Sequence, residues 1–74
     1  MNKIEVIYLK RLGKLFKQLR NKRGYSLEYI VEETGIKDLK KIENGKNTDF
    51  KSIFILCKFY EVDVRDVFTR YKKI

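Results

Sequence analysis

The sequence predicts an all-α fold: a compact bundle of five helices that contains a helix-turn-helix. Three observations lead to this prediction. The 74 residues contain no proline and only four glycines, apolar residues recur with helical rather than alternating spacing, and glycines stand where helices would end. Because no linker or internal repeat interrupts the pattern, we expect residues 1–74 to form a single domain.

The segment 20–45 carries the clearest local signals. Gly24 and Gly35 bracket an amphipathic stretch of about two helical turns, and Gly45 closes a second, shorter stretch. Ser26 is well placed to cap the first of these helices, since its hydroxyl can accept a hydrogen bond from an unpaired backbone N–H. Gly35 can end that helix in a left-handed conformation. The segment therefore predicts a helix, a tight turn and another helix.

The second short helix of this segment has apolar residues at every third position, namely Ile36, Leu39 and Ile42. Asp38 is expected to cap its start. With the apolar stripe turned inward, the polar side chains should face outward. These are Lys37, Lys40, Lys41 and Asn44.

The remaining segments complete the bundle. Residues 1–10 show no clear period, so they could form either the first turns of a long helix or an extended arm. Residues 12–23 have one apolar helical face. Asp49 and Asp63 can each cap a later helix, and residues 70–74 form a basic tail. The helix after Asp49 is apolar on more than one face, which predicts that it is the most buried of the five. Its apolar residues are Phe50, Ile53, Phe54, Leu56, Cys57 and Tyr60.

The net charge of +8 favours a polyanionic partner, and it is unevenly distributed. Residues 1–23 carry +7 (eight Lys/Arg and one Glu), residues 24–45 carry −2 (three and five), and the remainder carries +3 (seven and four). The predicted helix-turn-helix is thus mildly acidic, and the positive field arises mainly from the first helix. The cations there could form either a solvated face or phosphate contacts.

Several function classes are disfavoured. Cys57 is the only cysteine and there is no histidine, so we predict no disulfide, no metal site and no cofactor, with Cys57 in the core. Without histidine, a Gly-rich phosphate loop or paired carboxylates, an enzyme is not expected. No apolar run approaches the roughly 20 residues of a membrane span, and the N-terminus lacks a signal-peptide layout, so we expect no membrane contact and a cytoplasmic location. The small size also favours a homodimer.

Short motifs at consistent spacing run through most of the chain. They are Leu12-Gly13, Leu19-Arg20, Gly24-Tyr25-Ser26, Gly35-Ile36, Ile42-Glu43-Asn44-Gly45-Lys46-Asn47, and the run from Phe50 through Val62 to Val67-Phe68. Together, over residues 12–68, the chain resembles the Cro/CI-type (Xre-like) helix-turn-helix DNA-binding domains of bacterial and phage regulators. The resemblance implies a lambda-repressor-like bundle and double-stranded DNA as the partner.

The resemblance also implies roles for individual residues. Arg20 and Glu43 would form an internal salt bridge between the first helix and the end of the recognition helix. In such domains the recognition helix enters the major groove by its N-terminal end, and the loop after it grips phosphates. The residues that the resemblance and their chemistry assign to DNA are Ser26, Lys37, Lys40, Lys41, Asn44, Lys46 and Asn47.

The sequence departs from the family pattern at three places. Only two residues separate Ile36 from Leu39, where the family has about four, and the loss corresponds to roughly 3 Å of helix rise. Leu27 replaces a common Gln that contacts phosphate. Apolar residues that stand where the family has polar or small ones suggest a covered surface; they are Leu15, Leu27, Tyr29, Ile55 and Phe59.

Ile55 and Phe59 are four residues apart and are predicted to form half of a symmetric dimer contact. Alternatively, residues 1–10 fold back over them. The predicted function is a sequence-specific transcriptional regulator, such as a repressor, with no effector domain of its own, which acts as a homodimer on a palindromic operator. The alternative is a protein-interaction module on a helix-turn-helix scaffold, antitoxin-like or anti-repressor, because the recognition helix is short and its surroundings are acidic.

Overall fold

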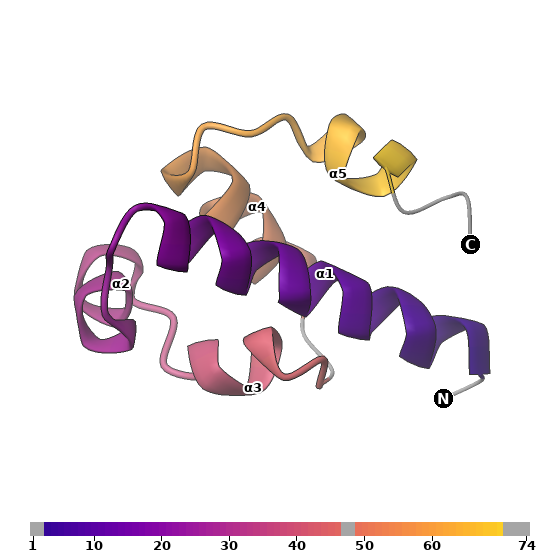
Figure 1. Ribbon diagram of the computed structural model, residues 1–74, viewed down its shortest axis with the longest axis horizontal. Coiled ribbons are helices and arrows are strands. Elements are labelled where there is room, and N and C mark those ends of the chain that lie inside the picture. The colour runs from indigo at the N-terminus through magenta and orange to yellow at the C-terminus, as the bar shows by residue number, and fades with distance from the viewer. Residues whose placement is uncertain (1–2, 47–48, 71–74) are drawn as a thin grey trace.

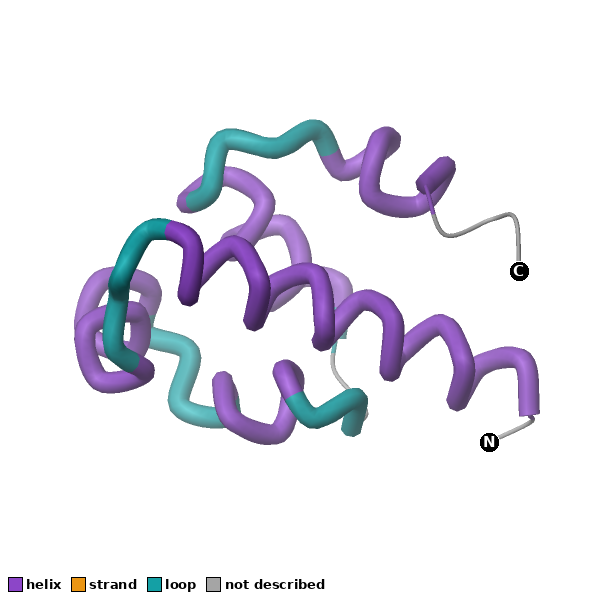
Figure 2. Tube along the Cα trace, viewed as in Figure 1, coloured by secondary structure: helices purple, strands orange, loops and turns teal. Residues whose placement is uncertain are grey.

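The computed structural model describes residues 3–46 and 49–70, with side chains to residue 67. The described residues form five helices and no strand, as Figures 1 and 2 show. The helices are α1 (Lys3–Lys22), α2 (Leu27–Thr34), α3 (Leu39–Glu43), α4 (Phe50–Phe59) and α5 (Val64–Arg70). The predicted all-α helix-turn-helix bundle is confirmed, with α2 and α3 as its two helices.

Helix α1 is the longest element, and the other helices are arranged around it (Figure 1). It begins at Lys3, so residues 3–10 extend the helix rather than form an extended arm. Leu12, Leu15 and Phe16 are buried along one side of it. Leu15, one of the apolar residues predicted to form a covered surface, is instead a core residue, because it lies on the same helical face as Leu12 and Phe16.

The hydrophobic core draws on every element from α1 to α4. The largest side chains that are almost fully enclosed are Phe16, Ile30, Leu39, Leu56 and Tyr60. The rings of Phe16 and Tyr60 stack with their centroids 6.3 Å apart. Cys57 is buried in the same core, as predicted. Each such side chain contributes about 1.5–3 kcal/mol relative to full exposure, so the short helices are held mainly by packing.

Helix α4 is buried on one face only, although its sequence predicts the most buried of the five helices. Ile53 and Leu56 face the core, but Phe50 and Phe54 are 65% and 53% exposed and lie on the outer side. Their rings are 6.3 Å apart at the centroids. The other helices cover only one side of α4, so its second apolar face has no layer of the bundle to pack against. Apolar content alone could not distinguish an inward from an outward aromatic residue.

Three predicted helix caps are present. Each cap side chain accepts a hydrogen bond from a backbone N–H in the first turn. The pairs are Ser26 with Tyr29 (3.1 Å), Asp49 with Ser52 (2.9 Å) and Asp63 with Arg65 (2.8 Å). These bonds satisfy N–H groups that have no partner within the helix.

The turn between α2 and α3 agrees with the prediction at one end only. Gly35 has φ of +75° and donates its N–H to the carbonyl of Val31 at 2.8 Å, which ends α2. Asp38 precedes α3, but its side chain makes no capping hydrogen bond, so the predicted cap is wrong. The reason is conformational: Ser26 has the extended backbone of a cap (ψ 161°), whereas Asp38 has ψ of 23°.

Candidate nucleic-acid interface

An ion pair connects α1 to the end of α3. The Arg20 guanidinium donates from Nε to Glu43 Oε2 at 2.9 Å and from Nη2 to Oε1 at 3.0 Å. The side chains are only 12% and 4% exposed. The hydrogen bond to Glu43 is the main cause that raises the pKa of Arg20, so the guanidinium stays protonated. The salt bridge implied by the family resemblance is present, and it is bidentate.

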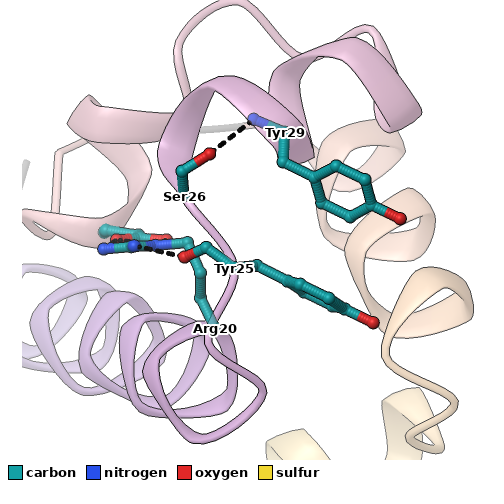
Figure 3. Close-up of polar contacts among 5 residues, drawn as sticks. Arg20, Tyr25, Ser26 and Tyr29 are labelled. Atoms are coloured by element: carbon teal, nitrogen blue, oxygen red, sulfur yellow. Dashed lines mark hydrogen bonds and ion pairs between the residues drawn. The ribbon is translucent and has the colours of Figure 1, made fainter.

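The same guanidinium holds the segment that leads into α2. Its Nη1 donates to the carbonyl oxygen of Tyr25 at 2.9 Å (Figure 3). Ser26 follows directly, and its side chain caps α2 by accepting from the N–H of Tyr29. Arg20 therefore fixes the start of α2 and the end of α3 at once, which sets the geometry of the helix-turn-helix.

A close approach of backbones completes this arrangement. Gly13 lies in the middle of α1, and a Cβ atom built there would lie 2.8 Å from the carbonyl oxygen of Glu43. Any side chain would push α3 away from α1. The structure thus explains both residues of the Leu12-Gly13 motif. Leu12 is buried in the core, and the missing side chain of Gly13 allows the backbone of α3 to pack closely against α1.

The exposed side of α3 carries the predicted reading residues. Lys40, Lys41 and Asn44 are exposed, as is Lys37 in the preceding turn. The opposite side of α3 contributes the buried Leu39 and Ile42. The predicted outward orientation is therefore confirmed, although α3 has only five residues from which to present these groups.

The connection after α3 adds one more cation. Gly45 has φ of +80°, and its backbone lies against α1: a Cβ there would be 2.8 Å from Lys10 Cα. Lys46 is exposed and donates its N–H to the carbonyl of Lys41 at 2.9 Å. Asn47, the last predicted phosphate contact, lies outside the described residues.

The surface between α2 and α3 is mixed in charge. An open groove of about 420 Å³ is lined by Leu27, Glu28, Val31, Glu32, Lys37, Leu39 and Lys40. Carboxylates thus stand on the α2 side and ammonium groups on the α3 side. Duplex DNA would meet attraction from α3 and repulsion from α2, since both of its strands are anionic.

A second open hollow of about 690 Å³ lies between the interhelical turn and the start of α4. Lys37 and Asp38 line it from the turn, and Asp49 and Lys51 line it from the other side. Its charges balance, so this hollow has no preference for an anion.

An aromatic cluster lies on the side of α2 that faces α4. Tyr25 and Tyr29 have ring centroids 4.8 Å apart, and Phe59 is 5.9 Å from Tyr25. Tyr29 is 41% exposed, and the charge of Glu33 is the main cause that raises its pKa. Phe59 and Ile55 are half-buried, so the predicted dimer residues are covered in part by the chain itself. They do not form a fully bare patch.

Sequence reasoning missed the role of Arg23. Its Nη2 donates to the carbonyl oxygen of Tyr60 at 2.8 Å, and its guanidinium lies 5.4 Å from the Tyr60 ring centroid. Because the partner is a backbone carbonyl 37 residues away, no local pattern could have revealed it. Burial raises the pKa of Tyr60 to about 12, and its hydroxyl has no hydrogen-bond partner among the described residues.

Two further features are absent from the described residues, a metal-binding cluster and a membrane-spanning helix. Within residues 3–46 and 49–70, no three His, Cys, Asp or Glu side chains are grouped closely enough to hold a metal ion. None of the described helices combines the length and apolar character needed to cross a membrane.

Comparison with known proteins agrees with this geometry. A family of helix-turn-helix domains matches the chain over residues 13–73. No curated protein and no solved structure matches it. The match spans most of the chain and confirms the predicted helix-turn-helix domain, a kind of domain typical of DNA-binding regulators. The chain belongs to the helix-turn-helix domain family.

Proposed function

We propose that this protein is a sequence-specific DNA-binding transcriptional regulator of the Cro/CI type, which binds a palindromic operator as a homodimer in the cytoplasm and has no catalytic role. The observation that carries the proposal is the exposed set Lys40, Lys41 and Asn44 on a helix whose position is held by the Arg20–Glu43 pair. Rigidly held side chains are what base reading requires, because a misplaced donor cannot meet a base edge.

The chemistry of these groups fits the major groove. A lysine ammonium donates to O6 and N7 of guanine, and an asparagine amide pairs with N6 and N7 of adenine. Lys46 lies just beyond α3 and Ser26 stands at the start of α2, where such domains contact phosphates. Since α3 has only five residues, we expect reading to be confined to few base pairs per half-site.

A homodimer would compensate for this short recognition element. Two copies double the phosphate contacts and read two half-sites one helical turn apart, roughly 34–36 Å. Ile55 and Phe59 are half-exposed on the same side of α4 and are the proposed contact. Phe59→Ser should then shift sedimentation from dimer to monomer, whereas Leu27→Ser, on a different face, should not.

The test of DNA reading is selection from random duplex fragments, with sequencing of the retained pool at low and near-physiological salt. A retained palindrome is the expected result. Lys40→Ala and Asn44→Ala should each relax preference at one position and cost about 1–3 kcal/mol of discrimination. Lys58→Ala, an exposed lysine on α4, is the matched control and should leave the motif unchanged. Retention without any motif would refute sequence reading.

A second candidate is a protein-interaction module, and the groove between α2 and α3 favours it. Leu27 and Val31 provide apolar contact there, with Glu28 and Glu32 beside them. A basic amphipathic helix of another protein would fit this lining better than DNA would. If a partner binds here, Val31→Lys should abolish the complex but leave binding to the selected duplex intact.

A further inference from the structure

The outer face of α1 carries a row of lysines that nothing in the fold explains. Lys3, Lys10, Lys14 and Lys17 are all exposed. Their spacing of seven, four and three residues places them on one side of the helix, opposite the buried Leu12 and Phe16. We define these four residues as the lysine face.

Two ion pairs of the described residues lie away from the lysine face. They are Arg20–Glu43 and Asp63–Arg65. Glu5 is the only acid in residues 3–23, and its position two residues after Lys3 puts it about 200° around the helix. Lys10, Lys14 and Lys17 repel one another at spacings of four and three residues. Lys3 also stands at the positive end of the helix dipole.

The length of the row indicates the kind of ligand. From Lys3 to Lys17 a straight helix rises roughly 21 Å, which is long enough for several of its lysines to reach phosphates of the same duplex. A free phosphate or a nucleotide would reach only one or two of these lysines. A membrane surface would need apolar side chains next to the cations, and the apolar face of α1 is instead used in the core.

The lysine face lies next to the candidate nucleic-acid interface but is not part of it. Lys10 lies against Gly45 in the connection after α3, so one edge of the face adjoins Lys46. However, α3 packs on α1 at Gly13 and Arg20, about a quarter turn around the helix from the lysine row. The two surfaces therefore point in different directions, although lysines stand on both.

We infer that the lysine face of α1 is a second DNA site, which binds the phosphate backbone of duplex DNA without regard to sequence and independently of the side chains of α3. This site provides affinity, because the segment 24–45 itself carries −2 and repels phosphates. The inference extends the proposed function but does not depend on it, since phosphate binding by α1 requires no base contact by α3.

The test compares two double variants with the same loss of charge, Lys14→Gln/Lys17→Gln on the lysine face and Lys58→Gln/Arg65→Gln on α4 and α5. Binding to a random-sequence duplex is measured at salt concentrations from about 0.05 to about 0.5 M, which gives the slope of log K against log salt. Losing two phosphate contacts should reduce the slope of log K against log salt by about 1.8. At 0.1 M salt this corresponds to about 60-fold weaker binding. The control pair should change the slope by far less, and Lys14→Arg/Lys17→Arg should retain it.

The outcomes separate this inference from the proposed function. If a selected sequence exists, its preference over random duplex should be unchanged in Lys14→Gln/Lys17→Gln and reduced in Lys40→Ala. Failure to select any sequence would refute base reading by α3. The salt slopes would still test phosphate binding by the lysine face of α1. An unchanged salt slope in folded Lys14→Gln/Lys17→Gln would overturn the inference, and so would an equal loss in the control pair. Binding to vesicles of anionic lipid is measured in parallel, and a loss that appears there but not with duplex DNA would also overturn it. Circular dichroism establishes that each variant is folded.

Discussion

Replacing Arg20 with Met tests whether the ion pair between α1 and α3 holds the helix-turn-helix together. The substitution keeps much of the apolar stem and removes the hydrogen bonds that Arg20 donates to Glu43 and to the carbonyl of Tyr25. The carboxylate of Glu43, which is 4% exposed, is then left without its cation. The start of α2 and the end of α3 lose their common contact in the same step.

The magnitude follows from the burial of the pair. Removing one partner of a buried ion pair costs about 3–5 kcal/mol, and the 12% exposure of Arg20 places this case near the lower end. Glu43→Gln should cost less, about 1.5–3 kcal/mol, because the amide oxygen can still accept one hydrogen bond. A domain of this size has a total stability of roughly 3–5 kcal/mol. We therefore expect Arg20→Met to retain at most about 2 kcal/mol of stability at 25 °C.

Urea unfolding followed by circular dichroism measures these differences, and the double variant Arg20→Met/Glu43→Leu completes the cycle. The double variant should be more stable than Arg20→Met alone, since no charge is left stranded. Arg65→Met is the matched control: its ion pair with Asp63 is exposed, and its loss should not change the unfolding midpoint measurably. A cost below about 1 kcal/mol for Arg20→Met, or additivity in the cycle, would refute this reasoning.

Three further predictions concern single positions. Gly13→Ala should destabilise by about 1–3 kcal/mol although alanine favours helices, because the new Cβ meets the backbone of α3; a higher melting temperature would contradict the close approach. Ser26→Ala should cost about 1 kcal/mol by removing the cap of α2, and Ser26→Asp, tested by the same thermal melts, should restore it. Tyr60→Phe should be neutral or stabilising at pH 7, because the buried hydroxyl has no partner among the described residues. Burial raises the pKa of Tyr60 to about 12, so the wild-type protein should lose stability between pH 10 and 12, where the unfolded chain releases the phenol proton first. Unfolding titrations over this pH range should show a smaller loss of stability in Tyr60→Phe. Equal losses in the two proteins would exclude Tyr60 as the cause.

Much of the fold follows from short-range patterns. The left-handed glycines, the caps at Ser26 and Asp49 and the apolar face of α1 depend on residues within one or two turns, so they are legible in the sequence. The Arg20–Glu43 pair was reached only through the family resemblance, because its partners are 23 residues apart. The outward orientation of Lys40 and its neighbours follows from the apolar stripe of α3.

By itself, the sequence determined the helical class, the helix-turn-helix, the core side of α1 and the uneven charge, since each depends on residue type and local spacing. The tertiary structure alone decided which apolar residues are covered: Leu15 enters the core, whereas Phe50 and Phe54 face outward on α4. It also decided that Asp38 does not cap α3, because that depends on a backbone angle rather than on residue type. The direction in which the lysine face of α1 points relative to α3 was likewise set by packing, through Gly13 and Arg20, and no local pattern encodes it.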